Sequence, residues 1–146
     1  MARAQIPDTS VLIQVFRDPD MWPSFQQSLA SGRVWLSSVV VAELYAGTRS
    51  REDARLLDRI VGAMSRVERV LTPTGSDWAR AGRLIARYTR LHGELKPRDH
   101  LADVLILVSA ARLGGVVLTT NVRHFGMWAD LAQKAGLTVG VERRFS

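Results

Sequence analysis

Short apolar segments alternate with longer segments of helical periodicity along this chain, and this alternation restricts its fold more than any other feature. Strands are predicted just before Asp8 and over residues 34–36, 70–71, 116–119 and 137–139. Helices are predicted over residues 11–16, 22–29, 39–46, 52–67, 77–91, 100–113 and 121–134. Strands that alternate with helices are typical of an α/β domain with a mostly parallel sheet. Sites in such sheets lie at the carboxyl ends of the strands, so the chemistry is sought there.

Polar residues that can cap helices mark two of the expected helix starts. Thr9 or Ser10 is expected to cap the first helix, because either hydroxyl can accept a hydrogen bond from a free backbone N–H. Asp99 is expected to cap the helix that starts at His100. On the helix over residues 77–91, Trp78 is expected on the apolar face.

The length and composition fit one compact domain over residues 1–146. Apolar residues make up 47% of the chain, which is enough for a substantial core. The chain has no cysteine, which excludes disulfides, cysteine-ligated zinc and thiol nucleophiles. Its amino terminus lacks the apolar region of a signal peptide, and no apolar run has the length of a membrane helix. We therefore expect a cytoplasmic protein without a membrane segment.

The formal net charge of +6 and the pI of about 10.9 favour a polyanionic partner, either a nucleic acid or an acidic protein. Nearly all of the positive charge is arginine, whose planar fork of donors suits phosphate. Four arginines recur on one face of the helix over residues 77–91: Arg80, Arg83, Arg87 and Arg90. This stripe either contacts phosphates or is simply the solvated face of the helix.

Three acidic residues interrupt segments in which a buried core would place apolar residues. Asp8 directly follows the first predicted strand, Glu43 lies within the run VVVAELYA, and Asp103 lies within LADVLILV. A lone buried carboxylate is costly unless it is paired, protonated or bound to a cation. One hard divalent cation such as Mg²⁺ or Mn²⁺, which prefers carboxylate and water oxygens, explains all three together.

Each of these acids also has a structural alternative. Asp8 is suited to cap the first helix, and Glu43 to pair with an arginine or to face solvent. Asp103 lies near the first turn of its helix, where a negative charge interacts favourably with the helix dipole. The sequence leaves these alternatives open for each residue separately.

Four short blocks, in order along nearly the whole chain, resemble the signatures of PIN domains. They are IPDTS at residues 6–10, VAELYAG at 41–47, DVLI at 103–106 followed by Ala110, and LTTNVRHF at 118–125. Their order and spacing are similar to those of VapC-type toxins of bacterial toxin–antitoxin pairs. Each block alone has low specificity, whereas four in order at this domain size are fairly specific.

The resemblance implies a doubly wound, mostly parallel sheet with strand order 3-2-1-4-5, flanked by helices. It also implies that Asp8, Glu43 and Asp103 bind Mg²⁺ or Mn²⁺ and catalyse the hydrolysis of single-stranded or loop RNA by a metal-activated water. Three further residues resemble family positions that form hydrogen bonds around the acids: Thr9, Ser10 and Thr119.

The last block departs from the family pattern, which commonly supplies a further acid at the position of Asn121 or three residues later. This chain has Asn121 and His124 there. Asn121 either orients a water or ligates through its amide oxygen, or it only caps the following helix. His124 either shuttles a proton or is a surface residue. Three carboxylates suffice for one metal, and the alternative function is a catalytically weak PIN-like module that only binds RNA or protein.

Asp99 is a rival acid for the same site. It precedes Asp103 by one helical turn, so the two carboxylates can face the same side of the helix. His92 and His100 are expected at the surface, and no pair of histidines has the spacing of metal ligands.

The resemblance further implies a homodimer and a cognate antitoxin protein that threads a segment into the acidic groove. Other classes lack their signatures in this chain. A phosphoacceptor receiver needs paired acids after its first strand and a lysine after a late strand, and neither is evident. Nucleotide-binding enzymes need a GxxxxGK[S/T] or GxGxxG loop, and neither is present.

Overall fold

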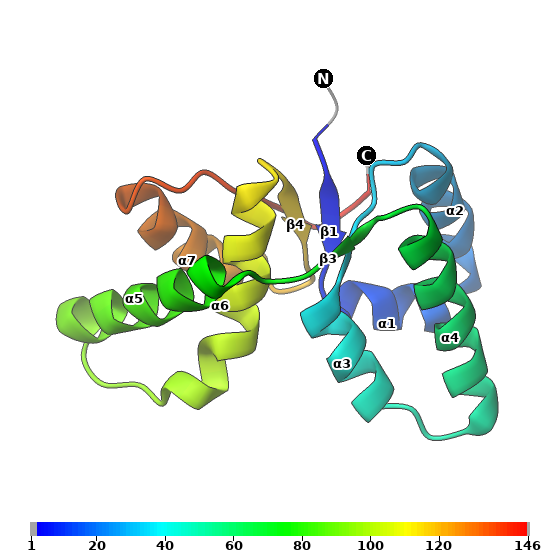
Figure 1. Ribbon diagram of the computed structural model, residues 1–146, viewed down its shortest axis with the longest axis horizontal. Coiled ribbons are helices and arrows are strands. Elements are labelled where there is room, and N and C mark those ends of the chain that lie inside the picture. Colours follow the sequence, from blue (N-terminus) through cyan, green and yellow to red (C-terminus); the bar gives the residue numbers. More distant parts are fainter. Residues whose placement is uncertain (1–2, 146) are drawn as a thin grey trace.

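The computed structural model of the protein describes residues 3–145, in which short strands have helices on both sides (Figure 1). The strands of this part of the chain are β1 (Gln5–Pro7), β2 (Leu36–Ser37), β3 (Val70–Leu71), β4 (Val116–Leu118) and β5 (Gly140–Glu142). The helices are α1 (Thr9–Arg17), the 3₁₀ helix η1 (Pro19–Met21), α2 (Trp22–Ala30), α3 (Ser38–Ala46), α4 (Arg51–Arg66), α5 (Gly75–His92), α6 (Pro97–Arg112) and α7 (Val122–Lys134). Helices α2 and α4 lie on one side of the strands, and α5, α6 and α7 lie on the other (Figure 1).

The strands follow the order β3-β2-β1-β4-β5, and all of the pairings are parallel. Strand β4 lies between β1 and β5, with Val117 opposite both Ile6 and Val141. Strand β2 pairs with β3, and a single bridge between Gln5 and Val34 joins this pair to β1. The predicted α/β class and strand order are therefore confirmed, with a narrow connection between the two halves of the sheet.

Helix α6 passes through the centre of the core, where every residue from 104 to 110 is buried. Just after it, a Cβ added at Gly115 would lie 2.6 Å from Cδ1 of Ile6 and 3.0 Å from the carbonyl oxygen of Ala4. Glycine is needed there because any side chain would push the end of α6 away from β1. Although α6 is apolar, no helix within residues 3–145 combines the length and apolar character needed to cross a membrane.

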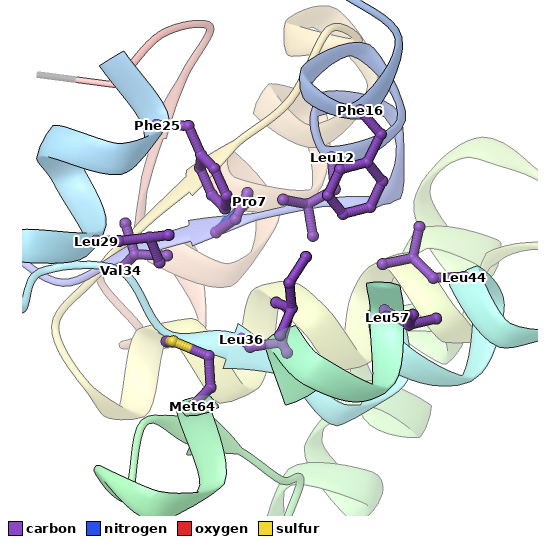
Figure 2. Close-up of a pocket in the computed structure, with 11 residues that line it drawn as sticks. Pro7, Leu12, Phe16, Phe25, Leu29, Val34, Leu36, Leu44, Leu57 and Met64 are labelled. Atoms are coloured by element: carbon purple, nitrogen blue, oxygen red, sulfur yellow. The ribbon is translucent and has the colours of Figure 1, made fainter. Parts of the chain in front are cut away.

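A second part of the core lies between the sheet and the helices α1 to α4. Figure 2 shows its apolar side chains, with Leu12 from α1, Leu36 from β2 and Leu57 from α4 directed toward the same space. The space left between them is only about 10 Å³, which is the lower limit for a single water. This region is packed core and offers no room for a ligand.

Two of the expected helix caps, those of α1 and α6, are wrong. Asp8, and neither Thr9 nor Ser10, caps α1, because its carboxylate accepts a hydrogen bond of 3.1 Å from a backbone N–H of the first turn. Helix α6 starts at Pro97, whose fixed φ suits the first helical position, so Asp99 lies inside the first turn and does not cap the helix.

Helix α5 begins before the expected residue because Thr74 and Asp77 form a capping box. The hydroxyl of Thr74 accepts a hydrogen bond of 3.1 Å from the N–H of Asp77, and the Asp77 carboxylate accepts one of 3.0 Å from the N–H of Thr74. Asp77 is therefore held inward and fully buried, whereas Trp78, expected on the apolar face, is 50% exposed.

The last strand, Gly140–Glu142, begins three residues after its predicted position at 137–139. The N–H of Leu137 donates to the carbonyl oxygen of Ala132 at 2.9 Å, and Gly136 has a φ of +89°. Residues 136 and 137 thus satisfy the carbonyl groups at the end of α7, in the manner of a helix-terminating glycine motif. These residues therefore end α7 and are not part of the last strand.

Candidate active site

Asp8 lies at the carboxyl end of β1, where the chain turns into α1. Its backbone N–H donates to the carbonyl oxygen of Leu118 at 2.8 Å, which continues the pairing with β4. The residue is only 6% exposed, and Oδ1 accepts a hydrogen bond from the N–H of Val11. Helix capping, the structural alternative for Asp8, is therefore present, and it holds the carboxylate at the edge of the sheet.

Ser10 connects Asp8 to the segment that follows β4. Its hydroxyl donates to Oδ1 of Asp8 at 2.6 Å, and its Oγ accepts a hydrogen bond of 3.2 Å from the N–H of Thr120. The sequence did not single out Thr120, because its contribution is a backbone N–H and carries no side-chain signature. These two bonds fix the ends of β1 and β4 relative to each other beside the carboxylate.

Glu43 reaches the same region from α3. The side chain of Ser37 caps this helix, and the C-cap is Gly47. The hydroxyl of Thr9 donates to Oε1 of Glu43 at 2.8 Å. Glu43 is exposed and forms no ion pair with an arginine or lysine of the described chain, so the pairing alternative for this residue is not realised.

Asp103 is half-buried on α6 and contacts His124 from the first turn of α7. The Nε2 atom of His124 lies 3.1 Å from Oδ2 of Asp103. The ring of His100 lies 5.7 Å from the ring of His124, so two histidines stand beside this carboxylate. His124 is therefore placed at the site.

Burial and mutual repulsion affect two of these three acids. Desolvation raises the pKa of the Glu43 carboxyl above its ordinary value, the hydrogen bond from Thr9 opposes this, and the charges of Asp103 and Asp8 add to it. Desolvation also raises the pKa of Asp103, with Asp8 contributing in the same direction, while His124 and His100 oppose the rise. Asp8, Glu43 and Asp103, hereafter the acidic cluster, therefore lie within electrostatic reach of one another.

The acidic cluster fits a hard divalent cation in its donor chemistry. Its members are carboxylates whose charges repel, and within residues 3–145 none of them pairs with an arginine or lysine. The side chains do not enclose such an ion as they stand, because no three His, Asp or Glu groups of the described chain lie close enough to ligate one ion. Mg²⁺ usually keeps several waters and is bound directly by one or two carboxylates, so a site for it need not enclose the ion with protein side chains.

The remaining predicted site residues are Thr119, Asn121 and Asp99. Thr119 is fully buried, and its hydroxyl oxygen accepts a hydrogen bond of 3.0 Å from the N–H of Asn121. Asn121 is exposed and caps α7 by accepting a hydrogen bond of 3.4 Å from the N–H of His124. Asp99 is exposed in the first turn of α6, and no described contact brings it to the acidic cluster.

The expectation of a surface position is wrong for His100, whereas His92 is exposed. His100 is half-buried, and its Nδ1 is buried without a hydrogen-bond partner among residues 3–145. The spacing of His100 and Asp103, three positions apart on one helix, is the sequence signal that would have placed the histidine near the site.

The arginine stripe of α5 lies apart from the acidic cluster. Arg80, Arg83, Arg87 and Arg90 line a hollow of about 440 Å³ against residues 135–137. No described hydrogen bond joins this hollow to an acid of the cluster. Both sequence alternatives for the stripe, phosphate contact and solvated face, therefore stay open.

Comparisons with known proteins agree with this geometry. The family model of the PIN domain matches residues 6–126. Ribonuclease VapC19 of Mycobacterium tuberculosis, from strains CDC 1551 / Oshkosh and ATCC 25618 / H37Rv, is 40% identical to this chain over 96 residues. The matched region is 65% of this chain and 69% of that protein.

Solved structures are also similar to this chain. The match with DNA-bound VapBC from Salmonella typhimurium covers 96% of this chain and 98% of the matched chain. Its TM-score is 0.67 at 24% identity. The match with VapBC2 from Rickettsia felis, bound to a DNA fragment from its promoter, covers 94% of this chain and 98% of the matched chain. Its TM-score is 0.65 at 17% identity. At these identities the likeness is one of fold.

Proposed function

The chain belongs to the PIN-domain family, and from this premise we propose that it is a metal-dependent endoribonuclease, the toxin of a toxin–antitoxin pair. The observation that carries the proposal is the acidic cluster itself. Its three carboxylates come from β1, α3 and α6, act electrostatically on one another, and have no arginine or lysine partner in the described chain. The similarity to a ribonuclease supports RNA as the substrate.

Asp8, Glu43 and Asp103 are the residues that would hold Mg²⁺ or Mn²⁺. A divalent ion at this place would supply positive charge beside the scissile phosphate and make a water molecule more acidic. Because hydrolysis by water needs no protein nucleophile, the lack of cysteine is consistent with this chemistry.

The other residues of the site hold these carboxylates in position. Ser10 and Thr9 donate to Asp8 and Glu43 and limit the rotation of their side chains. His124 orients Asp103, and its imidazole can accept or release a proton near the leaving group. Asn121 orients the start of α7, which carries His124.

The charges of the protein determine when RNA binds. The net charge of +6 attracts the polyanion, whereas the acidic cluster repels phosphate locally. Binding of single-stranded or loop RNA near the cluster should therefore depend on the divalent cation. We infer a cytoplasmic location from the proposed RNA substrate.

An antitoxin and a second copy of the chain are the proposed protein partners. The similar structures are complexes named VapBC, which supports an antitoxin partner for this chain. We infer that an antitoxin segment reaches the acidic cluster and that one of its basic residues neutralises the cluster in place of the metal. The homodimer is tested by light scattering over a range of concentrations, and a monomer throughout would contradict it.

Cleavage of a mixed RNA pool tests the proposed activity. The purified protein is incubated with Mg²⁺ or Mn²⁺ and, separately, with EDTA. The Asp8→Ala variant tests the cluster, and Asp130→Ala, which removes an exposed acid on α7, is the matched control. We expect metal-dependent cleavage that is lost in Asp8→Ala and kept in Asp130→Ala. Equal cleavage by Asp8→Ala and wild type would contradict the mechanism.

A binding module with a decayed site is the second candidate function. Two observations favour it: the carboxylates do not enclose an ion as they stand, and Asn121 caps a helix where the family commonly has an acid. Calorimetric titration with Mg²⁺ separates the two functions. Metal binding together with cleavage supports the nuclease, whereas neither metal binding nor cleavage supports the module.

A further inference from the structure

A second basic hollow lies next to the acidic cluster, at the carboxyl end of the chain. It has a volume of about 450 Å³ and lies between the strand-end segments and the α1–α2 region. Its polar lining comes from Gln14, Asp20, Ser24, Thr120, Arg143 and Arg144.

Two contacts fix the arginines of this hollow in place. On one side, the N–H of Thr119 donates to the carbonyl oxygen of Glu142 at 2.9 Å, which extends the pairing of β4 with β5. On the other side, the ring of Phe145 lies 5.5 Å from the ring of Phe25 on α2. The arginines at 143 and 144 lie between these two anchor points, so their backbone is not a free tail.

The hollow and the acidic cluster share a boundary at Thr120. This residue lines the hollow, and its N–H donates to Oγ of Ser10 at 3.2 Å. Ser10 in turn donates to Asp8 at 2.6 Å. A chain of two hydrogen bonds therefore connects the wall of the hollow to a carboxylate of the cluster.

The arginines of the hollow are available to an external anion. Neither Arg143 nor Arg144 forms an ion pair with an acid of the described chain. Asp20 also lines the hollow and offsets one of the two positive charges, which leaves the lining with net positive charge. Guanidinium groups donate bidentate hydrogen bonds to phosphate, and the hydroxyl and amide groups of the lining add neutral donors.

We propose that Arg143 and Arg144 form a subsite that binds a backbone phosphate of RNA next to the phosphate being cut. This inference rests on the proposed ribonuclease function and extends it to residues that the sequence analysis did not single out. The subsite offsets the repulsion between the acidic cluster and the RNA by holding the flanking part of the strand. Arg143 and Arg144 are thus positioning residues, whose loss should weaken substrate binding more than it slows the chemical step.

Steady-state cleavage of a fluorescein-labelled single-stranded RNA, taken from the sequence around a mapped cut, tests this subsite. The variant R143A/R144A is compared with R55A/R59A, which removes the same charge from the exposed face of α4. We expect KM to rise about tenfold in R143A/R144A with kcat within about twofold of wild type, since flanking phosphate contacts act mainly on binding. In R55A/R59A we expect KM to stay near the wild-type value.

The salt dependence of KM provides a second measurement. For single strands, each lost phosphate contact should reduce the slope of log KM against log salt by about 0.7. The variant R143K/R144K keeps both charges but lacks the bidentate fork, so its KM should lie between those of wild type and R143A/R144A. An alanine defect that lysine does not relieve would indicate lost packing of residues 143–145 and would overturn the subsite.

The remaining outcomes separate this inference from the function on which it rests. An unchanged KM in R143A/R144A, or an equal rise in R55A/R59A, overturns the subsite and leaves the nuclease intact. If the wild-type protein cleaves no RNA under any metal condition, the proposed function fails, and the subsite fails with it.

Discussion

Helix α6 contributes to two acidic sites, and these sites differ in how the negative charge of the carboxylate is neutralised. Near the carboxyl end, Nε of Arg112 donates to Oδ2 of Asp77 at 3.1 Å, and Arg112 also donates to the carbonyl oxygen of Thr72 at 2.9 Å. Asp77 is fully buried and also accepts from the N–H of Thr74. Toward the amino end, Asp103 has only His124 as a described ion-pair partner.

These two settings distinguish a structural acid from a candidate metal ligand. The charge of Asp77 is paired with a guanidinium that belongs to the fold, so it needs no external cation, although its Oδ1 is buried without a hydrogen-bond partner among residues 3–145. The acidic cluster lacks a fixed cation of this kind, and partial desolvation and repulsion raise the pKa of Glu43 and of Asp103. A carboxylate group that the fold leaves short of positive charge is suited to bind a mobile cation.

The largest expected effect separates the two acids of α6 that the sequence left as rivals. Asp103→Asn should lower the single-turnover cleavage rate about a thousandfold, which corresponds to about 4 kcal/mol in the barrier. Asp99→Asn, in the exposed first turn of the same helix, should change the rate by less than about twofold. A strong defect in Asp99→Asn together with a weak one in Asp103→Asn would reverse the assignment.

The structural ion pair gives the next largest effect, on stability. Arg112→Ala leaves the charge of Asp77 buried without its partner and should lower the free energy of unfolding by about 3 kcal/mol. Urea denaturation measures this loss. The cleavage rate of the folded variant should stay near that of wild type, because Arg112 is remote from the acidic cluster. A neutral effect on stability would show that Asp77 does not depend on the arginine.

The smallest expected effect is that of Glu43→Gln on the free energy of unfolding. Its sign depends on whether a divalent metal is present. Because the pKa of Glu43 is raised in the folded state, that state holds its proton to higher pH than the unfolded chain does. The free energy of unfolding therefore falls as pH rises from the ordinary carboxyl range, about pH 4, through the raised pKa. At neutral pH without metal, Glu43→Gln should be slightly more stable than wild type, by about 0.3 kcal/mol after solvent screening.

A divalent metal should make the wild-type protein more stable than Glu43→Gln. Binding to the folded state stabilises it by about 1.4 kcal/mol at a concentration ten times Kd, and Glu43→Gln should lose most of this gain. Urea denaturation at neutral pH, with EDTA and with Mg²⁺, measures both differences. If Glu43→Gln is less stable than wild type in EDTA, the carboxylate is satisfied within the fold, as Asp77 is, and the comparison between the two settings fails.

Much of the fold follows from local pattern. Apolar periodicity predicts the helices and four of the strands, because a helix or strand shows its buried face within a few residues. The same patterns singled out Asp8, Glu43 and Asp103, since an acid in an apolar run is visible without knowledge of its neighbours. The strand order, by contrast, was implied by the family resemblance rather than by these patterns.

Other features of the fold and the site depend on contacts between residues far apart in the chain. The pair of Asp77 and Arg112 spans 35 positions, and the bond between Thr120 and Ser10 spans 110. Leu137 has the residue type of a strand, but its N–H is used at the end of α7. Charge neutralisation and hydrogen bonding act through space. The local sequence pattern therefore identifies the acids that are out of place, whereas the folded chain shows which acid already has a cationic partner.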